Sequence, residues 1–290
     1  MANLKEIRSR ITSVGSTMQI TSAMKMVSAA KLKRAQDAVT QLRPYANKLR
    51  DILSNISSTL DASAGGELTV QREVKKILLV VVTSNRGLAG AFNSNIVKKT
   101  NSIISGAKDN GIEVELLTIG KKGFDLLKNQ SKVYKNSSSI WDDLNFDEIA
   151  MISEELTQKF ASGEFDQVRI VYNQFKNAAT QIVMDEQYLP VQIQADEGEA
   201  VTSSVDYIFE PSKEQIVTDL IPQTLKTQLY KAILDSNAAE HGARMTAMHK
   251  ATDNAEALQR ELILQYNKER QAAITNEILE IVGGAEALGG

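Results

Sequence analysis

The stretch SNRGLAGAFNSN, residues 84–95, has the composition of a loop that could hold a phosphate. It follows an apolar run over residues 77–82 that predicts a buried strand, and a turn that opens a helix can offer backbone N–H groups to an anion. A dinucleotide fingerprint needs G-x-G-x-x-G and a P-loop ends in G-K-[ST], whereas this turn has only Gly87 and Gly90. We therefore favour a structural strand-to-helix turn, in which Arg86 forms local hydrogen bonds, over a nucleotide site.

Few other residues could do chemistry. The chain has no Cys, which excludes disulfides, cysteine zinc sites and thiol chemistry, and its two histidines, His241 and His249, are eight residues apart. Zinc ligands on one helix face stand four residues apart, and both histidines fall in one predicted helix. Asp142 and Asp143 fit a loop or a helix cap better than an acid–base pair. The sequence therefore predicts no catalytic, cofactor-binding or metal-binding residue.

Composition limits the fold to soluble classes with long helices. The 290 residues suggest one or two domains, and 42% hydrophobic with 24% charged residues excludes a disordered chain, a collagen and a membrane-spanning bundle. Only four residues are Pro, which suits uninterrupted helices. The longest apolar run has six residues, against about 18 for a membrane span, and the N-terminus lacks the apolar core of a signal peptide.

Both ends of the chain predict long helices that must pack on a partner. Residues 3–60 contain an apolar stripe at helical spacing, formed by Ile7, Ile11, Val14 and Met18, which then slips to a second register at Ile20, Met24 and Val27. A second helix is expected from residue 213 to about 282, where Gly283 and Gly284 form a natural stop. Its stripe is formed by Met245, Met248, Ala255, Leu258, Leu262, Tyr266, Ile274, Ile278 and Ile281.

Between the helices, residues 74–195 alternate strand and helix patterns, which indicates a small α/β domain with a mostly parallel sheet. The polar stretch 194–204 is expected to be a loop. Because an isolated amphipathic helix is unstable in water, the two stripes must bury each other. The predicted fold class is therefore α/β: a long antiparallel coiled coil of helices 1–60 and 211–288, with an inserted Rossmann-like domain at 74–195.

Charge and apolar residues both indicate partners. Residues 1–50 carry ten basic and two acidic groups, a local charge of +8, so the remaining 240 residues carry −11. This asymmetry suits nucleic acid, an anionic membrane or an acidic protein surface, although a solvated helix face would show it too. The last apolar residues have no partner within a two-helix coil, and we favour their insertion into a partner surface over a frayed terminus; they are Ile281, Val282, Ala285, Ala287 and Leu288.

Three segments resemble the gamma subunit family of F-type ATP synthases. They are LKEIRSRITSV with ITSAMKMVSAAKLKRAQ near the N-terminus, the turn SNRGLAGAFN, and the C-terminal ARMTAMHKATDNAEAL with YNKERQAAITNEILEIVGGAEAL. The turn is similar to the family's SDRGLCGGFN, with Asn85 for the usual Asp and Ala89 for the usual small residue or Cys, and Ser22 stands where Lys is common. The chain looks like bacterial forms, because it shows neither a transit peptide nor an insert with paired Cys.

The resemblance implies a rotor stalk without catalytic residues or cofactors. It would turn inside a ring of three alpha and three beta subunits and meet the epsilon subunit and the membrane c ring, peripheral to the cytoplasmic face of the bacterial inner membrane. Proton flow would thereby be coupled to ATP synthesis or hydrolysis in the ring. No nucleic acid would bind.

The resemblance also implies roles for particular residues. Those expected to contact beta subunits are Arg8, Arg10, Met24, Lys25, Arg270, Gln271, Thr275 and Glu277. Ile281, Val282 and Leu288 would lie in the apolar sleeve of the ring. Two alternatives stay open: an enzyme that binds a nucleotide on the 74–195 domain, and a basic coiled coil that binds nucleic acid.

Overall fold

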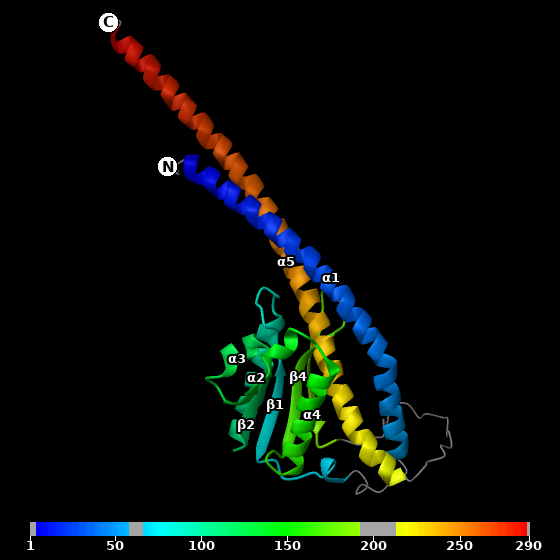
Figure 1. Cartoon of the computed structure of the whole chain (residues 1–290). Coiled ribbons are helices and arrows are strands. Elements are labelled where there is room, and N and C mark those ends of the chain that lie inside the picture. The colour runs from blue at the N-terminus through cyan, green and yellow to red at the C-terminus, as the bar shows by residue number, and fades with distance from the viewer. Residues whose placement is uncertain (1–3, 58–65, 192–212, 289–290) are drawn as a thin grey trace. The chain divides into compact units, whose positions relative to one another are not determined.

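The computed structural model describes residues 4–57, 66–191 and 213–288, so the loop expected at 194–204 lies outside the described residues. In chain order the elements are α1 (Leu4–Ser57), the 3-10 helix η1 (Gly66–Leu68), β1 (Lys76–Val82), α2 (Phe92–Asp109), β2 (Glu113–Ile119), α3 (Lys121–Leu127), β3 (Lys132–Asn136), the 3-10 helix η2 (Ser138–Trp141), α4 (Phe146–Ala161), β4 (Gln167–Phe175), β5 (Gln181–Leu189) and α5 (Lys213–Leu288). They form two compact units (Figure 1). We call residues 29–244 the α/β unit, and residues 1–28 with 245–290 the helical unit.

The α/β unit is built on one five-stranded sheet in the order β3-β2-β1-β4-β5. Strands β1 to β4 are parallel, and β5 pairs antiparallel with β4. The apolar run that predicted a buried strand is β1, whose residues 77–82 are all buried. A strand covered on both faces must be apolar on both, which explains its unbroken Ile, Leu and Val residues. The mostly parallel sheet predicted for this segment is confirmed.

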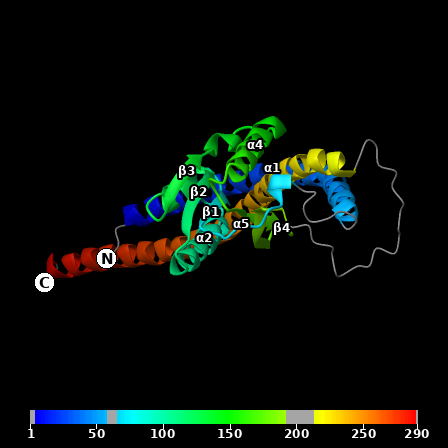
Figure 2. The ribbon, with the colours of Figure 1, turned by 90° about the horizontal axis from the view of Figure 1, so that it is seen from below.

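Helices cover both faces of the sheet. Even-numbered residues of β1, such as Leu78 and Val80, pack with α4 and with α5 residues 221–233, whereas odd-numbered Leu79 and Val81 pack with α2. Because side chains alternate along a strand, α2 and α4 lie on opposite faces, as Figure 2 shows. The first part of α5 is therefore a member of the α/β core.

The helical unit is an antiparallel pair formed by the first part of α1 and the last part of α5 (Figure 1). Thr21 Oγ1 lies 2.8 Å from Thr252 Oγ1, and a Cβ on Gly15 would lie 2.9 Å from Gln259 Nε2. Partner numbers rise on one helix as they fall on the other, so the helices run in opposite directions. The predicted fold class, an antiparallel coiled coil with an inserted α/β domain, is confirmed.

The predicted slip of the α1 stripe is wrong. Positions facing α5 recur at alternating spacings of four and three along residues 7–28, and Thr21 and Ser28 are buried among them. Ile20 and Val27, which were expected to continue the stripe, are 60% and 57% exposed. The hydroxyls can occupy the seam because each finds a partner: Thr21 bonds Thr252, and Ser28 Oγ donates to the Met24 carbonyl at 2.8 Å.

On α5 the seam follows a strict heptad. Met248, Ala255 and Leu262 are buried at intervals of seven, while Leu258, expected in the stripe, is exposed. The stop expected at Gly283 and Gly284 is also wrong, because α5 continues to Leu288. A glycine costs a helix about 1 kcal/mol, which does not by itself end it.

Candidate functional site

Exposed apolar side chains are concentrated on the helical unit. On α1 they are Ile20, Met26 and Val27, and on α5 they are Leu258, Ile263, Leu264, Ile274, Ile278, Leu279, Ile281 and Val282. We call these residues the apolar surface. Soluble monomers seldom leave so many large apolar side chains in water unless they mark a binding surface. The helical unit therefore has the character of a protein interface.

The residues expected to contact partner subunits lie on this unit and none is fully buried. Met24 and Lys25 are half-buried beside exposed Val27, and Arg10 donates to Glu6 at 2.6 Å within the first turns of α1. On α5 the Thr275 hydroxyl donates to the main-chain carbonyl of Gln271 at 2.9 Å, and Gln271 is exposed. The other expected contacts in the described side chains, Arg8, Arg270, Glu277, Ile281 and Val282, are exposed. Leu288 lies in α5, but its side chain is outside the described set.

In the α/β unit, the turn that resembled a phosphate loop is held rigidly from within. The Ser84 hydroxyl donates to the Arg86 carbonyl at 2.7 Å, and Ser84 N–H donates to Asn93 Oδ1 at 3.0 Å. Asn85 donates from Nδ2 to the Ser138 carbonyl at 3.0 Å and accepts from Lys121 N–H at 2.9 Å. These polar groups of the turn are therefore engaged in hydrogen bonds within the chain.

The crevice beside this turn is filled by α5. Strand order reverses between β1 and β4, and in doubly wound sheets ligands bind outside the carboxyl ends of the strands at such a point. Here Ala239 and Ala243 of α5 pack against Ala89 and Phe92, which follow β1. This arrangement supports the structural turn favoured from the sequence. Arg86 forms a local hydrogen bond, as expected, because its carbonyl accepts the Ser84 hydroxyl.

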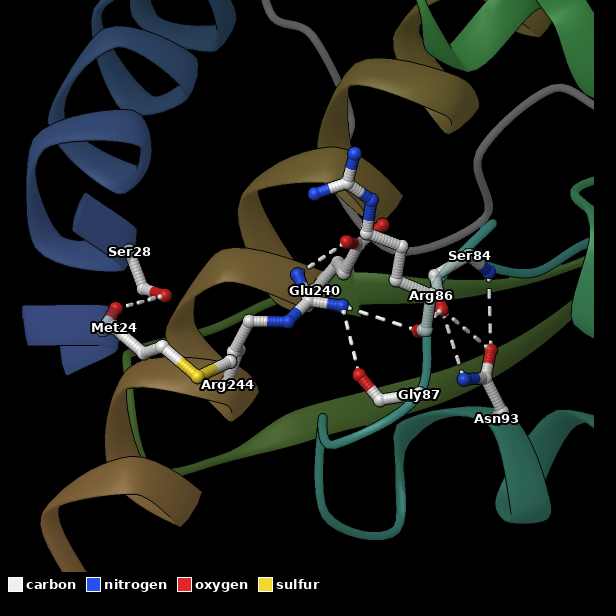
Figure 3. A network of polar contacts seen from close by, with 8 residues as sticks. All are labelled: Met24, Ser28, Ser84, Arg86, Gly87, Asn93, Glu240 and Arg244. Carbon is white, nitrogen blue, oxygen red and sulfur yellow. Dashed lines mark hydrogen bonds and ion pairs between the residues drawn. The ribbon is translucent and has the colours of Figure 1, made fainter. Parts of the chain in front are cut away.

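Arg244 and Glu240 of α5 are buried next to the turn, and sequence reasoning missed them (Figure 3). Arg244 donates to the carbonyls of Arg86 and Gly87 at 3.1 and 3.3 Å, and its other terminal nitrogen contacts Glu240 Oε1. Burial raises the pKa of the Glu240 carboxyl, against the opposing effect of Arg244. The available signal was the pattern AAEHGAR, in which two charges four residues apart stand among small residues on one helix face.

The two histidines have unrelated surroundings. His249 is exposed, and its Nδ1 lies 3.3 Å from Asp253. His241 is half-buried and its Nδ1 has no hydrogen-bond partner within the described part of the chain. No group of three potential ligands gathers around a metal position among the residues described. Asp142 is the C-cap residue of the 3-10 helix η2, where its backbone N–H donates to the Ser139 carbonyl, and Asp143 lies in the loop that follows, so both stand at the loop or cap positions expected.

His241 should make the α/β unit less stable in acid. Burial, Arg244 and Lys31 lower the pKa of His241 to about 4, whereas the unfolded chain takes up this proton near the ordinary value of 6.5. The contribution to stability is therefore complete above about pH 6.5 and is lost as the pH falls towards 4. In urea unfolding, the free energy of unfolding of the parent chain should fall by on the order of 1 kcal/mol between about pH 7 and 5. The His241→Gln variant should not show this fall. Parallel pH curves for variant and parent would contradict this.

The whole chain matches known proteins. A sequence model of the ATP synthase family matches residues 3–288. Proteins named ATP synthase gamma chain from Flavobacterium psychrophilum and Chlorobium phaeobacteroides are 63% and 46% identical, each comparison covering 100% of both chains. The chain belongs to the ATP synthase gamma chain family. Membership of this family makes it a rotor stalk subunit of F-type ATP synthase, as the sequence motifs predicted.

Solved structures of mitochondrial ATP synthases share the fold. The central stalk and c ring of Tetrahymena thermophila includes a chain 26% identical, with a TM-score of 0.58 over 80% of this chain and 99% of that chain. The F1 and c-ring assembly of Euglena gracilis includes one 20% identical, with a TM-score of 0.70 over 98% and 94%. Among the residues described here, no helix has the length and apolar character needed to cross a bilayer.

Proposed function

We propose that this chain is the non-catalytic central shaft of a bacterial F-type ATP synthase, turning within a ring of three alpha and three beta subunits. The observation that carries this proposal is the apolar surface of the helical unit, most of all Ile278, Ile281 and Val282, which α1 does not cover. A sleeve of partner subunits would remove these side chains from water. The α/β unit would meet the epsilon subunit and the c ring at the cytoplasmic face of the inner membrane.

Coupling then follows from unequal contacts. A helical pair with different side chains around its circumference presents a different face to each of three catalytic sites. A face that binds one beta conformation better than another shifts that site's affinity by the difference in contact free energy. The basic N-terminal part of α1 would face acidic loops of the beta subunits, which would account for its local charge of +8.

The direct test is co-expression of the tagged chain with the alpha and beta subunits of the same organism. We expect one copy of the chain to purify with three alpha and three beta subunits, and sustained ATP hydrolysis to require its presence. A soluble chain that ignores both subunits and binds ATP in calorimetry would favour the enzyme alternative. Binding to nucleic acid with steep salt dependence would favour the basic coiled coil.

Charges introduced at the end of α5 should weaken this assembly. We expect Ile278→Asp with Ile281→Asp to reduce recovery of the alpha–beta ring on the tagged chain about tenfold, because each carboxylate would have to be desolvated in an apolar sleeve. The matched control is Leu126→Asp with Met151→Asp, at comparably exposed apolar positions of the α/β unit. Equal recovery by both double variants would contradict the proposed sleeve.

A further inference from the structure

Arg244 is a charged side chain that joins α5 to the turn after β1 by hydrogen bonds (Figure 3). Its side chain is almost completely buried, and one terminal nitrogen donates to both the Arg86 and Gly87 carbonyls. Glu240, one helical turn earlier, holds the other terminal nitrogen. Both terminal nitrogens of the guanidinium are therefore held by partners within the α/β unit.

The remaining contact between this part of α5 and the end of the sheet is made by small residues. Ala239 and Ala243 pack on Ala89 and Phe92, and a Cβ on Gly242 would come within 3.2 Å of Ala178 Cα. Such residues let the backbones approach closely, but small side chains interdigitate little and so define the orientation of the helix less sharply than large ones. Hydrogen bonds have a preferred direction, and weaken steeply when donor and acceptor are misaligned. Arg244 therefore adds a directional contact, next to the turn, to the core packing of α5 residues 221–233 and to the Lys226–Glu154 ion pair at 2.5 Å.

The acceptor side of this contact is equally well fixed. The Arg86 carbonyl also accepts the Ser84 hydroxyl, and Ser84 in turn is held by Asn93 at the start of α2. Asn173 of β4 donates from Nδ2 to the Phe92 carbonyl at 3.1 Å, which ties the same region to the sheet. The Arg86 and Gly87 carbonyls should therefore move together with the sheet when a force acts on it.

We infer that Arg244, oriented by Glu240, is a positioning residue that locks the rotational setting of α5 against the α/β unit. The inference rests on the proposed rotor function, because torque applied to the α/β unit has to pass into α5. Without the lock, α5, when the catalytic ring drives it, would slip against the sheet before the α/β unit followed. ATP hydrolysis would then continue while fewer protons were moved for each ATP.

The guanidinium suits this role because its planar fork presents donors in several fixed directions. A lysine could keep the charge but not all three contacts at once. Arg260 provides a matched control on the same helix. It forms an equivalent i,i+4 pair with Glu256, but both side chains are largely exposed and both residues belong to the helical unit.

The test uses inverted membrane vesicles that contain the whole ATP synthase. We expect the ratio of proton pumping to ATP hydrolysis to fall several-fold in Arg244→Met and by less in Arg244→Lys. Arg260→Met should leave the ratio unchanged. The ratio is measured per assembled complex, so a merely structural effect that lowers the amount of complex does not alter it. If Arg244→Met fails to assemble, Arg244→Lys decides the question by the same ratio.

Two results would overturn the inference: a normal ratio in assembled Arg244→Met or Arg244→Lys complexes, or an equal fall in Arg260→Met. Failure of the underlying rotor proposal is distinguishable, because the unaltered chain would then not assemble with the alpha and beta subunits. If the unaltered chain assembles and pumps normally and the Arg244 variants also pump normally, the inference about Arg244 is wrong and the rotor proposal stands.

Discussion

Replacing Gly120 by alanine is expected to prevent the α/β unit from folding stably. Gly120 directly follows β2 with φ at 110°, a conformation that residues with a Cβ rarely adopt. A Cβ there would lie 2.0 Å from the Thr83 carbonyl oxygen and 2.5 Å from its carbon, both backbone atoms at the end of β1. Neither can move, because Thr83 N–H donates to the Ile119 carbonyl at 2.8 Å. We expect a loss of about 4 kcal/mol or more, comparable with the whole stability of many domains.

Urea unfolding followed by circular dichroism would measure this loss. Gly106→Ala is the matched control, since Gly106 lies on the exposed side of α2 and no atom stands within 4 Å of its added Cβ. That substitution should raise stability by about 0.5–1 kcal/mol through helix propensity. A Gly120→Ala midpoint close to that of the parent chain would show that the β1 and β2 ends can separate at little cost.

The elements of the α/β unit could be predicted because their sequence signals are local. A continuous apolar run gave β1, and in α4 the apolar residues Ile149, Ile152, Leu156 and Phe160, which recur at helical spacing, are all buried. The residue pattern also placed the turn 84–93 between a strand and a helix. Each signal depends on burial of neighbouring side chains, which periodicity reports directly.

The coiled-coil register could not be predicted from hydrophobicity, because polar residues occupy part of the seam. Thr21 and Ser28 are buried there, while the more apolar Ile20 and Val27 face outward. In an isolated two-helix coil the apolar residues would be expected inside. Their reversal is a reason to expect a further partner, since a surface that is to be covered by another protein need not be polar.

Arg244 escaped prediction for a different reason. Its partners, the Arg86 and Gly87 carbonyls, are about 158 residues away in sequence and belong to the main chain, so no side-chain pattern encodes them. Only the pair spacing with Glu240 was visible. The residues proposed to contact beta subunits remain predictions of the same kind, because their partners belong to other chains.

Combining Met24→Lys with Gln271→Ala is expected to uncouple proton pumping from ATP hydrolysis. Met24 lies half-buried beside exposed Val27, and the Gln271 side chain is exposed on α5. A new cation facing acidic loops of the beta subunits would over-stabilise one rotary position, and loss of the amide would remove a contact from another. A shift of about 1 kcal/mol already changes the ratio of two states about fivefold. We therefore expect a fall of about fivefold in protons pumped per ATP hydrolysed, with assembly and hydrolysis retained.

The experiment compares this double variant with Gln130→Ala combined with Met151→Lys, which makes the same chemical changes at exposed positions of the α/β unit. The control should pump like the unaltered complex, because neither residue is proposed to meet the ring. Normal pumping by the Met24 and Gln271 variant would remove these two residues from the coupling surface. Loss of pumping in both variants would point to a general sensitivity to added charge. If only the variant in the helical unit loses coupling, the shaft works through the unequal contacts of its own side chains, since both variants change side chains and not the backbone.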